Sequence, residues 1–214
     1  LGGMVQLQVD KLSPFPVENM VVSYEIMEKG KDFCNVLVAA AKNDVVDGIG
    51  KLLADAGISP SRVDVNVLGW WQVLKDSGNA ANTGRQIILL LSDVVPEIIL
   101  CQDGLPLVFR SLSEQGPLTD EEFAAEIAAE TANTLMSLEL EHSGGGRCLI
   151  SVWHRGAQPV FLMEKLQQAC PCEVSLQSLE SLPGVSEGFA RRTAGGGHLL
   201  DLTPLSWRVT GSEK

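Results

Sequence analysis

Cys170-Pro171-Cys172 is the short motif whose residue types most readily suggest chemistry. Two thiols separated by one residue can bind a soft metal ion or exchange with a disulfide. No histidine and no second cysteine pair lies nearby in the sequence, so a turn that leads into a strand explains the motif more simply. The chain has five cysteines, and an odd number without tight spacing favours reduced thiols and a cytosolic setting. Cys34 and Cys101 lie in apolar runs and are expected in the core.

The residues that hydrolytic catalysis needs are scattered. The GxSxG motif of serine hydrolases is absent, and His142, His154 and His198 form no helical pair. A two-metal nuclease of the ribonuclease H type needs clustered carboxylates, one of them from the centre of its first strand. The corresponding run, "QIILLL", has no acid in its interior. We therefore expect no catalytic residues and no metal site, and each histidine is expected to be structural or solvated.

The turn between two apolar runs, from residue 92 to residue 96, stands where nucleotide-binding folds hold a phosphate. Its residues are Ser92, Asp93, Val94, Val95 and Pro96. Without a glycine the backbone cannot approach a pyrophosphate closely, and Pro96 has no amide to donate. Asp93 could hold a water molecule of a Mg²⁺ ion, but an exposed Asx turn explains it more simply. We expect a degenerate phosphate turn and no ATP cofactor.

Two glycine-rich segments are alternative phosphate loops. Residues 143–147 follow a predicted helix and enter a predicted strand, so they meet the negative end of the helix dipole. Residues 194–198 follow the last predicted helix and are typical of a C-cap and linker. Both are interpreted as connections.

Length and charge exclude several classes of protein. The chain has 214 residues, enough for one large domain or two small ones, and a formal net charge of -11. Nucleic-acid binding needs clustered Lys and Arg, so the acidic balance argues against it. No apolar run approaches the roughly 20 residues of a membrane span.

The elements that position these motifs begin with a short helix in "MVQLQVDKL" and a hairpin of "MVVSYEIM" and "FCNVLVAAA". An amphipathic helix follows, capped by Asn43 or Asp44 and ended by Gly57. Its predicted buried face consists of Val45, Val46, Ile49, Leu52, Leu53 and Ala56, with Leu53 fully buried. "RVDVNVL" is then predicted as a strand and "GWWQVLKD" as a helix, in a strand-helix-strand crossover. Trp70 and Trp71 are expected beneath a sheet, although an interaction site is the alternative.

After a polar loop at 78–84, three strands are predicted at 86–91, 97–101 and 107–112. A long helix follows, with Thr119 and Glu122 at capping-box spacing. Its predicted buried stripe is Phe123, Ile127, Thr134, Leu135 and Leu138. The chain then continues as strand, helix, strand and helix. This order is similar to the ribonuclease H-like topology of the actin and Hsp70 ATPase superfamily.

The predicted fold class is therefore α/β, an actin-like (ribonuclease H-like) fold with mixed sheets flanked by helices. Two subdomains are expected, at 1–84 and 85–197, followed by a C-terminal tail at 198–214.

A more specific resemblance lies in the N-terminal part. Its matching residues are Pro14, Phe15, Pro16 and Glu18, then Ser23, Tyr24, Glu25 and Ile26. Further matches are Ala39, Ala40, Val45, Val46, Asp47, Ala56, Gly57, Pro60 and residues 63–65. This pattern, with "ILCQDGLPLVFRSL" and the closing "HLLDLTPLSWR", resembles the PilM family of type IV pilus assembly proteins and its type II secretion relative GspL. The resemblance covers most of the chain.

The resemblance implies a non-enzymatic cytoplasmic scaffold of an inner-membrane assembly platform, on the cytoplasmic face of the bacterial inner membrane. It implies a PilN-like membrane protein segment and an assembly ATPase as partners, and it allows a homo-oligomer. The family's opening Asp-x-Gly loop would precede Leu1, so either the sequence is truncated or that segment is lacking. Arg155-Gly156-Ala157 carries a single glycine where the family has a Gly-Gly turn beside the adenine, which further weakens a nucleotide site.

Two other functions stay open. One is an ATP-binding enzyme of the same superfamily, an ATPase or sugar kinase with part of its site outside this sequence. The other is a filament protein like those of bacterial cell division.

The tail supplies the candidate partner-binding residues Leu202, Pro204, Trp207 and Arg208. We expect Leu200 to Trp207 to pack on the chain's own surface, with a membrane helix beyond Lys214. A final strand with a disordered end is the alternative.

Overall fold

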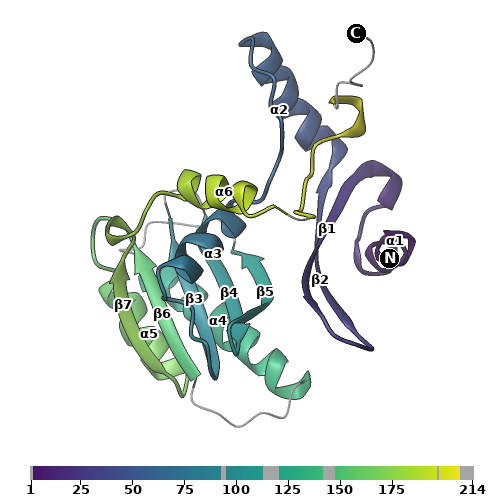
Figure 1. Cartoon of the computed structure of the whole chain (residues 1–214). Coiled ribbons are helices and arrows are strands. Elements are labelled where there is room, and N and C mark those ends of the chain that lie inside the picture. Colours follow the sequence, from purple (N-terminus) through teal and green to yellow (C-terminus); the bar gives the residue numbers. More distant parts are fainter. Residues whose placement is uncertain (1, 93–94, 113–120, 142–147, 197, 208–214) are drawn as a thin grey trace. The chain divides into compact units, whose positions relative to one another are not determined.

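The computed structural model describes residues 2–92, 95–112, 121–141, 148–196 and 198–207 (Figure 1). The chain divides into two compact units. The first unit consists of Leu1–Leu68 together with Ala190–Lys214, and the second of Gly69–Phe189. Within the described residues no helix combines the length and the apolar character that crossing a membrane requires.

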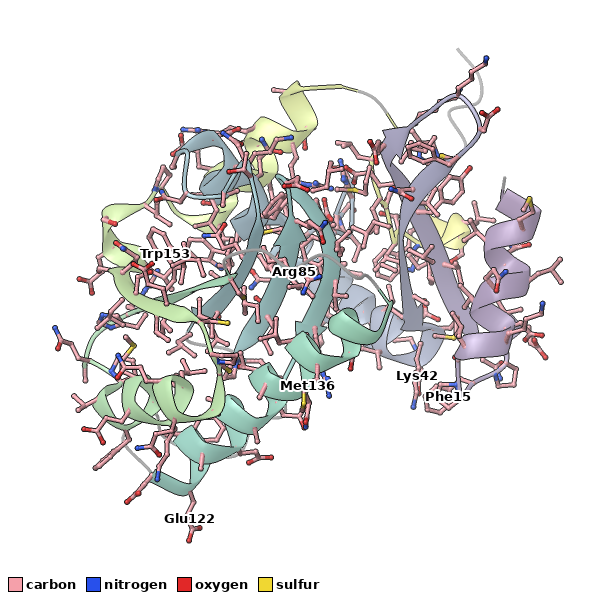
Figure 2. The ribbon with its side chains drawn as sticks, turned by 90° about the horizontal axis from the view of Figure 1, so that it is seen from below. Phe15, Lys42, Arg85, Glu122, Met136 and Trp153 are labelled. Atoms are coloured by element: carbon pink, nitrogen blue, oxygen red, sulfur yellow. The ribbon has the colours of Figure 1, made fainter. Side chains whose placement is uncertain are left out.

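The first unit is built on a two-stranded antiparallel sheet. Helix α1 (Gly2–Leu12) and a 3-10 turn η1 (Val17–Asn19) precede the strands β1 (Met20–Lys29) and β2 (Cys34–Lys42). The predicted hairpin is confirmed: Met20 pairs with Lys42 and Lys29 with Cys34, and the register shifts between Ile26 and Glu28. At the base of the hairpin the Lys42 ammonium lies 3.8 Å above the centre of the Phe15 ring (Figure 2).

Helix α2 (Asn43–Asp55) forms as predicted, but its buried face is narrower than expected. Val46 is buried, whereas Val45, Ile49, Leu52 and Ala56 are exposed. Leu53 is only half-buried, so the prediction of full burial is wrong. The helix has the small two-stranded sheet of its own unit to pack on, which leaves room for a narrow contact only.

The capping of α2 was predicted correctly at its C-terminal end but not at its N-terminal end. Neither predicted residue caps the start: the N-cap is Lys42, without a side-chain bond, and the Asn43 amide donates to the Glu18 carbonyl. Gly57 ends the helix as predicted, with a positive φ of 74°. The Ile58 N–H donates to the Leu53 carbonyl at 2.8 Å, which makes this end a Schellman motif.

The prediction of a strand at residues 62–68 is wrong, and the predicted strand-helix-strand crossover is therefore wrong as well. Residues 61–65 are irregular, and helix α3 (Asn66–Asp76) starts three residues before its predicted place. The Asp64 carboxylate accepts a hydrogen bond from the Val65 N–H at 2.8 Å. Such a local bond competes with strand pairing, so alternation of apolar and polar residues alone misled the prediction.

The second unit contains a five-stranded mixed sheet in the order β5-β4-β3-β6-β7 (Figure 1). Its strands are β3 (Arg85–Leu91), β4 (Glu97–Gln102), β5 (Leu105–Ser111), β6 (Cys148–His154) and β7 (Glu173–Ser178). The strands β3, β4 and β5 form an antiparallel meander, and β6 and β7 run parallel to β3. This arrangement confirms the predicted order of three strands followed by alternating helices and strands.

Helices cover both faces of this sheet. On one face, α4 (Glu121–Glu141) and α5 (Val160–Ala169) pack on Ile87, Leu89 and Val152 in one apolar core. Phe123, Ile127, Thr134 and Leu135 are buried as predicted, whereas the Leu138 side chain and Thr119 lie outside the described parts. The opposite, outward side of α4 carries exposed residues such as Glu122 and Met136 (Figure 2).

On the other face lie α3 and, after a 3-10 turn η2 (Leu179–Ser181), the first half of α6 (Val185–Ala194). Trp70 and Trp71 are each 3% exposed, as predicted for residues beneath a sheet. The two helices approach closely at Gly69 and Gly188, because a Cβ at Gly188 would overlap the Gly69 carbonyl. Glycine at both positions therefore permits the backbone contact.

The compact units have other bounds than the predicted subdomains. Residues 69–84 belong with the second unit because α3 contributes buried residues such as Val73 and Leu74. Residues 190–207 belong with the first unit, because the boundary between the units falls within α6.

Candidate functional site

The candidate site is a groove in the first unit that holds the chain's own segment His198–Trp207, called here the C-terminal segment. It runs in irregular, extended form to Pro204 and ends in a 3-10 turn, η3 (Leu205–Trp207). Leu200 is fully buried and Leu202 is 5% exposed, whereas Leu205 is 82% exposed. The segment is therefore anchored by two leucines that alternate with polar residues, as in an added β-strand.

Main-chain hydrogen bonds hold the middle of the C-terminal segment. The Leu202 N–H donates to the Val63 carbonyl at 2.8 Å, and the Asp201 N–H donates to the Ser23 hydroxyl at 2.9 Å. The Val63 N–H in turn donates to the Thr203 hydroxyl at 2.9 Å. Residues 62–65, which the sequence predicted as a strand, thus serve as one wall of the groove.

Two opposite charges bracket Leu200. The Glu25 carboxylate accepts a hydrogen bond from the Leu200 N–H at 3.1 Å, and the Arg62 guanidinium donates to the Leu200 carbonyl at 2.7 Å. Hydrogen bonds to charged groups contribute about 1.5–3 kcal/mol each, more than neutral ones. Both bonds go to main-chain atoms, so they hold the extended backbone of the segment and do not depend on the Leu200 side chain.

A buried ion cluster fixes these two charged side chains. Arg192, at the end of α6, donates to Glu25 Oε2 at 2.6 Å, and its side chain is only 4% exposed. Its Nε lies 3.6 Å from Asp64 Oδ2, too long for a hydrogen bond but close enough for attraction. Asp64 also pairs with Arg62 at 2.7 Å. Two acids and two arginines neutralise each other, so neither Glu25 nor Arg62 is buried as an unpaired charge.

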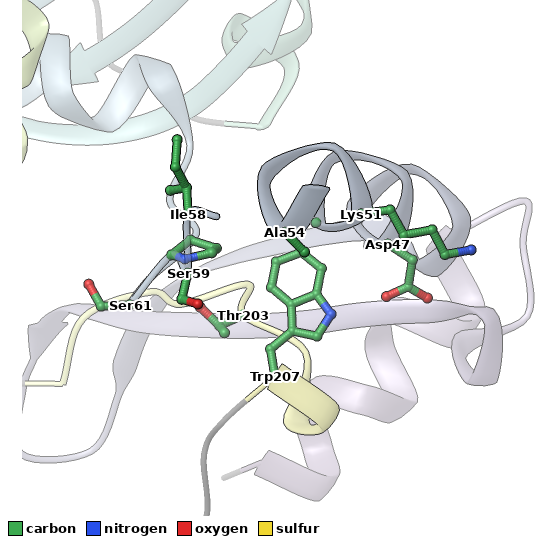
Figure 3. A pocket seen from close by; sticks show the side chains of 10 residues that line it. Asp47, Lys51, Ala54, Ile58, Ser59, Ser61, Thr203 and Trp207 are labelled. Carbon is green, nitrogen blue, oxygen red and sulfur yellow. The ribbon is translucent and has the colours of Figure 1, made fainter. Parts of the chain in front are cut away.

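Trp207 fastens the far end of the segment to α2. Its indole lies so close to Gly50 that a Cβ there would clash with the ring. The ring borders a cavity of about 540 Å³, together with Asp47, Lys51 and Thr203 (Figure 3). The hollow leaves open space beside the segment.

A second hollow runs along β1, on the side of Ser23 and Tyr24. It has a volume of about 610 Å³ and is bordered by the C-terminal segment through His198, Asp201 and Pro204. The His198 and Tyr24 rings are stacked, with their centres 5.1 Å apart. The groove is therefore wider than the segment that occupies it.

The structure groups most of the predicted partner-binding residues in this groove. Leu202 and Pro204 are buried, Trp207 is half-buried, and Arg208 lies outside the described residues. The expected packing on the chain's own surface is seen for Leu200, Leu202, Pro204 and Trp207, whereas Leu205 and Ser206 are exposed. A role in binding a partner stays a prediction.

Sequence reasoning gave no role to Glu25, Arg62, Asp64 and Arg192. Glu25 and Arg192 are 167 positions apart, so no local spacing links them. The one available signal was a charged residue within an apolar, strand-like run, as in "VVSYEIM" and "RVDV".

The predicted phosphate turn in the second unit is described only in part, since Asp93 and Val94 lie outside the described residues. Among the described residues, the buried hydroxyl of Ser92 has no hydrogen-bond partner. Pro96 is buried, and its carbonyl accepts a bond from the Leu112 N–H at 2.8 Å. Gly156 has a positive φ of 68°, and Val95 is half-buried. Neither ATP binding nor its absence follows from these positions, and the degenerate turn stays a prediction.

In the parts of the chain that the structure describes, no three His, Cys, Asp or Glu side chains converge on a position for a metal ion.

Comparison with known proteins gives the fold. No protein-family profile and no curated protein matches the chain. Among solved structures, a chain of the "PilM-PilN type IV pilus biogenesis complex" is similar with a TM-score of 0.61 and 17% identity, over 87% of this chain and 62% of that one. A protein of Bacteroides thetaiotaomicron with an actin-like ATPase fold and unknown function has a TM-score of 0.55 and 10% identity, over 89% of this chain and 66% of its own. The chain thus has an actin-like fold and spans less than two thirds of the pilus protein chain.

Proposed function

We propose that the protein is a PilM-like or GspL-like scaffold of an inner-membrane assembly platform for type IV pili or type II secretion. In this role it acts at the cytoplasmic face of the bacterial inner membrane. It docks an extended peptide of a bitopic, PilN-like membrane partner, and it contacts the assembly ATPase. The structural likeness to a pilus biogenesis complex supports this proposal.

The observation that carries the proposal is the groove of the first unit. It binds an extended backbone through the Leu200 peptide groups, which Glu25 and Arg62 bracket. It is filled by the chain's own segment here, and an external peptide with a similar apolar spacing fits the same contacts. The role is one of binding, because positioned donors, acceptors and apolar anchors are what the groove offers.

Occupation by the chain's own segment sets a threshold for any partner. A segment tethered in the same chain acts at an effective concentration in the millimolar range. An external peptide must therefore bind more tightly than the segment does, or bind while the segment is released. Docking and release of the segment would then regulate access to the groove.

Co-purification tests the function. The chain is to be co-expressed with the bitopic membrane proteins of its own pilus or secretion gene cluster, and the complexes are isolated in mild detergent. We expect one bitopic protein to co-purify with the unaltered chain. The Arg192→Glu variant, which reverses the central charge of the cluster, should lose it. The matched control is Arg110→Glu, which reverses one charge of the exposed pair Arg110–Glu130 in the second unit. This variant should still co-purify with the bitopic protein. Absence of any bitopic partner, or equal recovery with all three chains, would contradict the proposed role.

A further inference from the structure

Three of the five cysteines gather at the amino ends of β6 and β7, outside the groove. Leu149 on β6 pairs with Glu173 on β7, so Cys148 and Cys172 stand beside each other one residue earlier on the two neighbouring strands. Both are half-buried and pack against the apolar core beneath α4 and α5. Cys170, the C-cap residue directly after α5, is buried next to them. The Cys-x-Cys motif of the sequence is therefore joined by a third thiol from a neighbouring strand.

The geometry of Cys148 and Cys172 suits a disulfide. The register of the two strands places Cys148 directly beside Cys172, and all five cysteines of the chain are free thiols. Neighbouring strands lie about 4.8 Å apart, which is within the roughly 4.4–6.8 Å that a disulfide spans between Cα atoms. Because both residues are partly exposed, a small reagent can reach them.

We propose that Cys148 and Cys172 form a reversible, oxidisable thiol pair that links the starts of β6 and β7. The oxidant is a low-molecular-weight disulfide. The Cys172 thiolate attacks one sulfur of that disulfide, forms a mixed disulfide and releases the first thiolate of the reagent. The Cys148 thiolate then attacks the Cys172 sulfur and releases the second. Two cysteine thiols are oxidised, one reagent disulfide is reduced to two thiols, and these carry the two protons.

The surroundings make the second attack slow at neutral pH. Burial raises the pKa of Cys148 to about 12, and the neighbouring Cys172 thiol adds to the shift. The guanidinium of Arg85, whose residue pairs with Cys148 across β3 and β6 and is 7% exposed, lowers this pKa without offsetting the burial. Burial also raises the pKa of Cys170 to about 11. Since the thiolate is the nucleophile, ring closure should accelerate about tenfold for each unit of pH well below the pKa of Cys148.

Thiol mapping tests the proposal on the unaltered chain. The folded protein is incubated with oxidised glutathione at several pH values, quenched in acid, alkylated, digested and analysed by mass spectrometry. We expect a peptide pair linked through Cys148 and Cys172, and its rate of formation should rise with pH. At the lowest pH, glutathione should remain attached to Cys172. Added dithiothreitol should restore both thiols.

Three variants complete the test. Cys172→Ser should abolish the link, Cys170→Ser should leave it, and Cys101→Ser serves as the control for a buried cysteine elsewhere in the sheet. A link between Cys170 and Cys172 in the unaltered chain would overturn the proposal. Cys34 is exposed, so its predicted place in the core is wrong, and modification of Cys34 alone would also overturn the proposal. Because the unaltered chain gives the main result, these outcomes decide even if a variant fails to fold.

Discussion

Replacement of Glu25 by glutamine tests how strongly the buried ion cluster holds the C-terminal segment. The substitution keeps the size of the side chain and an acceptor for the Leu200 N–H. It removes the negative charge that faces Arg192, which lies 2.6 Å away. Asp64, 3.6 Å from the same guanidinium, stays in place. The perturbation is therefore one lost charge in an otherwise intact groove.

The expected cost follows from burial and distance. The side chains of Arg192 and Glu25 are 4% and 12% exposed, so water screens their attraction little. Unit charges about 4 Å apart attract by about 4 kcal/mol at an effective dielectric constant of about 20. Removal of one partner from a buried pair costs about 3–5 kcal/mol. Because Asp64 compensates in part, we expect Glu25→Gln to lower the free energy of unfolding by about 2–3 kcal/mol.

The coupling energy of the pair is measured by urea denaturation of four chains. These are the unaltered chain, Glu25→Gln, Arg192→Gln and the double variant Glu25→Gln/Arg192→Gln. We expect a coupling of about 2 kcal/mol, together with faster hydrogen exchange at the Leu200 amide. Arg110 and Glu130 form the control pair, because their side chains are 47% and 35% exposed. Exposed pairs couple by about 1 kcal/mol or less. Equal coupling in the two pairs, or a cost below about 0.5 kcal/mol for Glu25→Gln, would refute the reasoning.

Further predictions concern the ends of the segment and the phosphate turn. Gly50→Val should displace the Trp207 indole and speed hydrogen exchange at the Trp207 amide, whereas Gly48→Val on the same helix, where a Cβ meets open space, should leave that amide unchanged. Equal effects of the two valines would mean that Trp207 is not fastened to α2. Leu200→Ala should cost about 2–5 kcal/mol in urea denaturation, and Leu205→Ala, at an exposed position, less than about 0.5 kcal/mol. Similar losses at both positions would contradict the burial of the segment. Calorimetric titration with ATP and Mg²⁺ should give no saturable signal below roughly 100 μM, about 5.5 kcal/mol of binding, because the turn lacks glycine; a signal in that range would show a working nucleotide site.

Strong local patterns made the second unit predictable. The run "QIILLL" is apolar throughout, as a central strand buried on both faces must be, and each residue of β3 is buried. Short turns then fixed the order of the next two strands, and the helix after them showed its stripe at Phe123 and Ile127. Here local preference and tertiary environment agree, so the sequence was sufficient.

The groove depends on contacts that no local pattern contains. Arg62 and Asp64 alternate with valines like residues of a strand, yet they serve as charged wall residues for a segment 138 positions away. The outward face of α2, with Ile49 and Leu52, was predicted as buried because amphipathic spacing does not reveal how much sheet is available to cover it. The groove could not be predicted from the sequence, because its walls come from segments that lie far apart along the chain.

Binding of the segment in trans tests the docking groove most directly. In a Leu202→Ser chain the buried anchor of the segment is lost, so the tethered segment should leave the groove open. A synthetic peptide that copies residues 198–208 is titrated into this chain by calorimetry, and a peptide with the same Leu202→Ser change is the control. We expect the natural peptide to bind the Leu202→Ser chain saturably and the unaltered chain more weakly, because the chain's own segment competes there. The control peptide should not bind. Equal binding of the two peptides, or no binding of the natural peptide to a folded Leu202→Ser chain, would contradict this expectation.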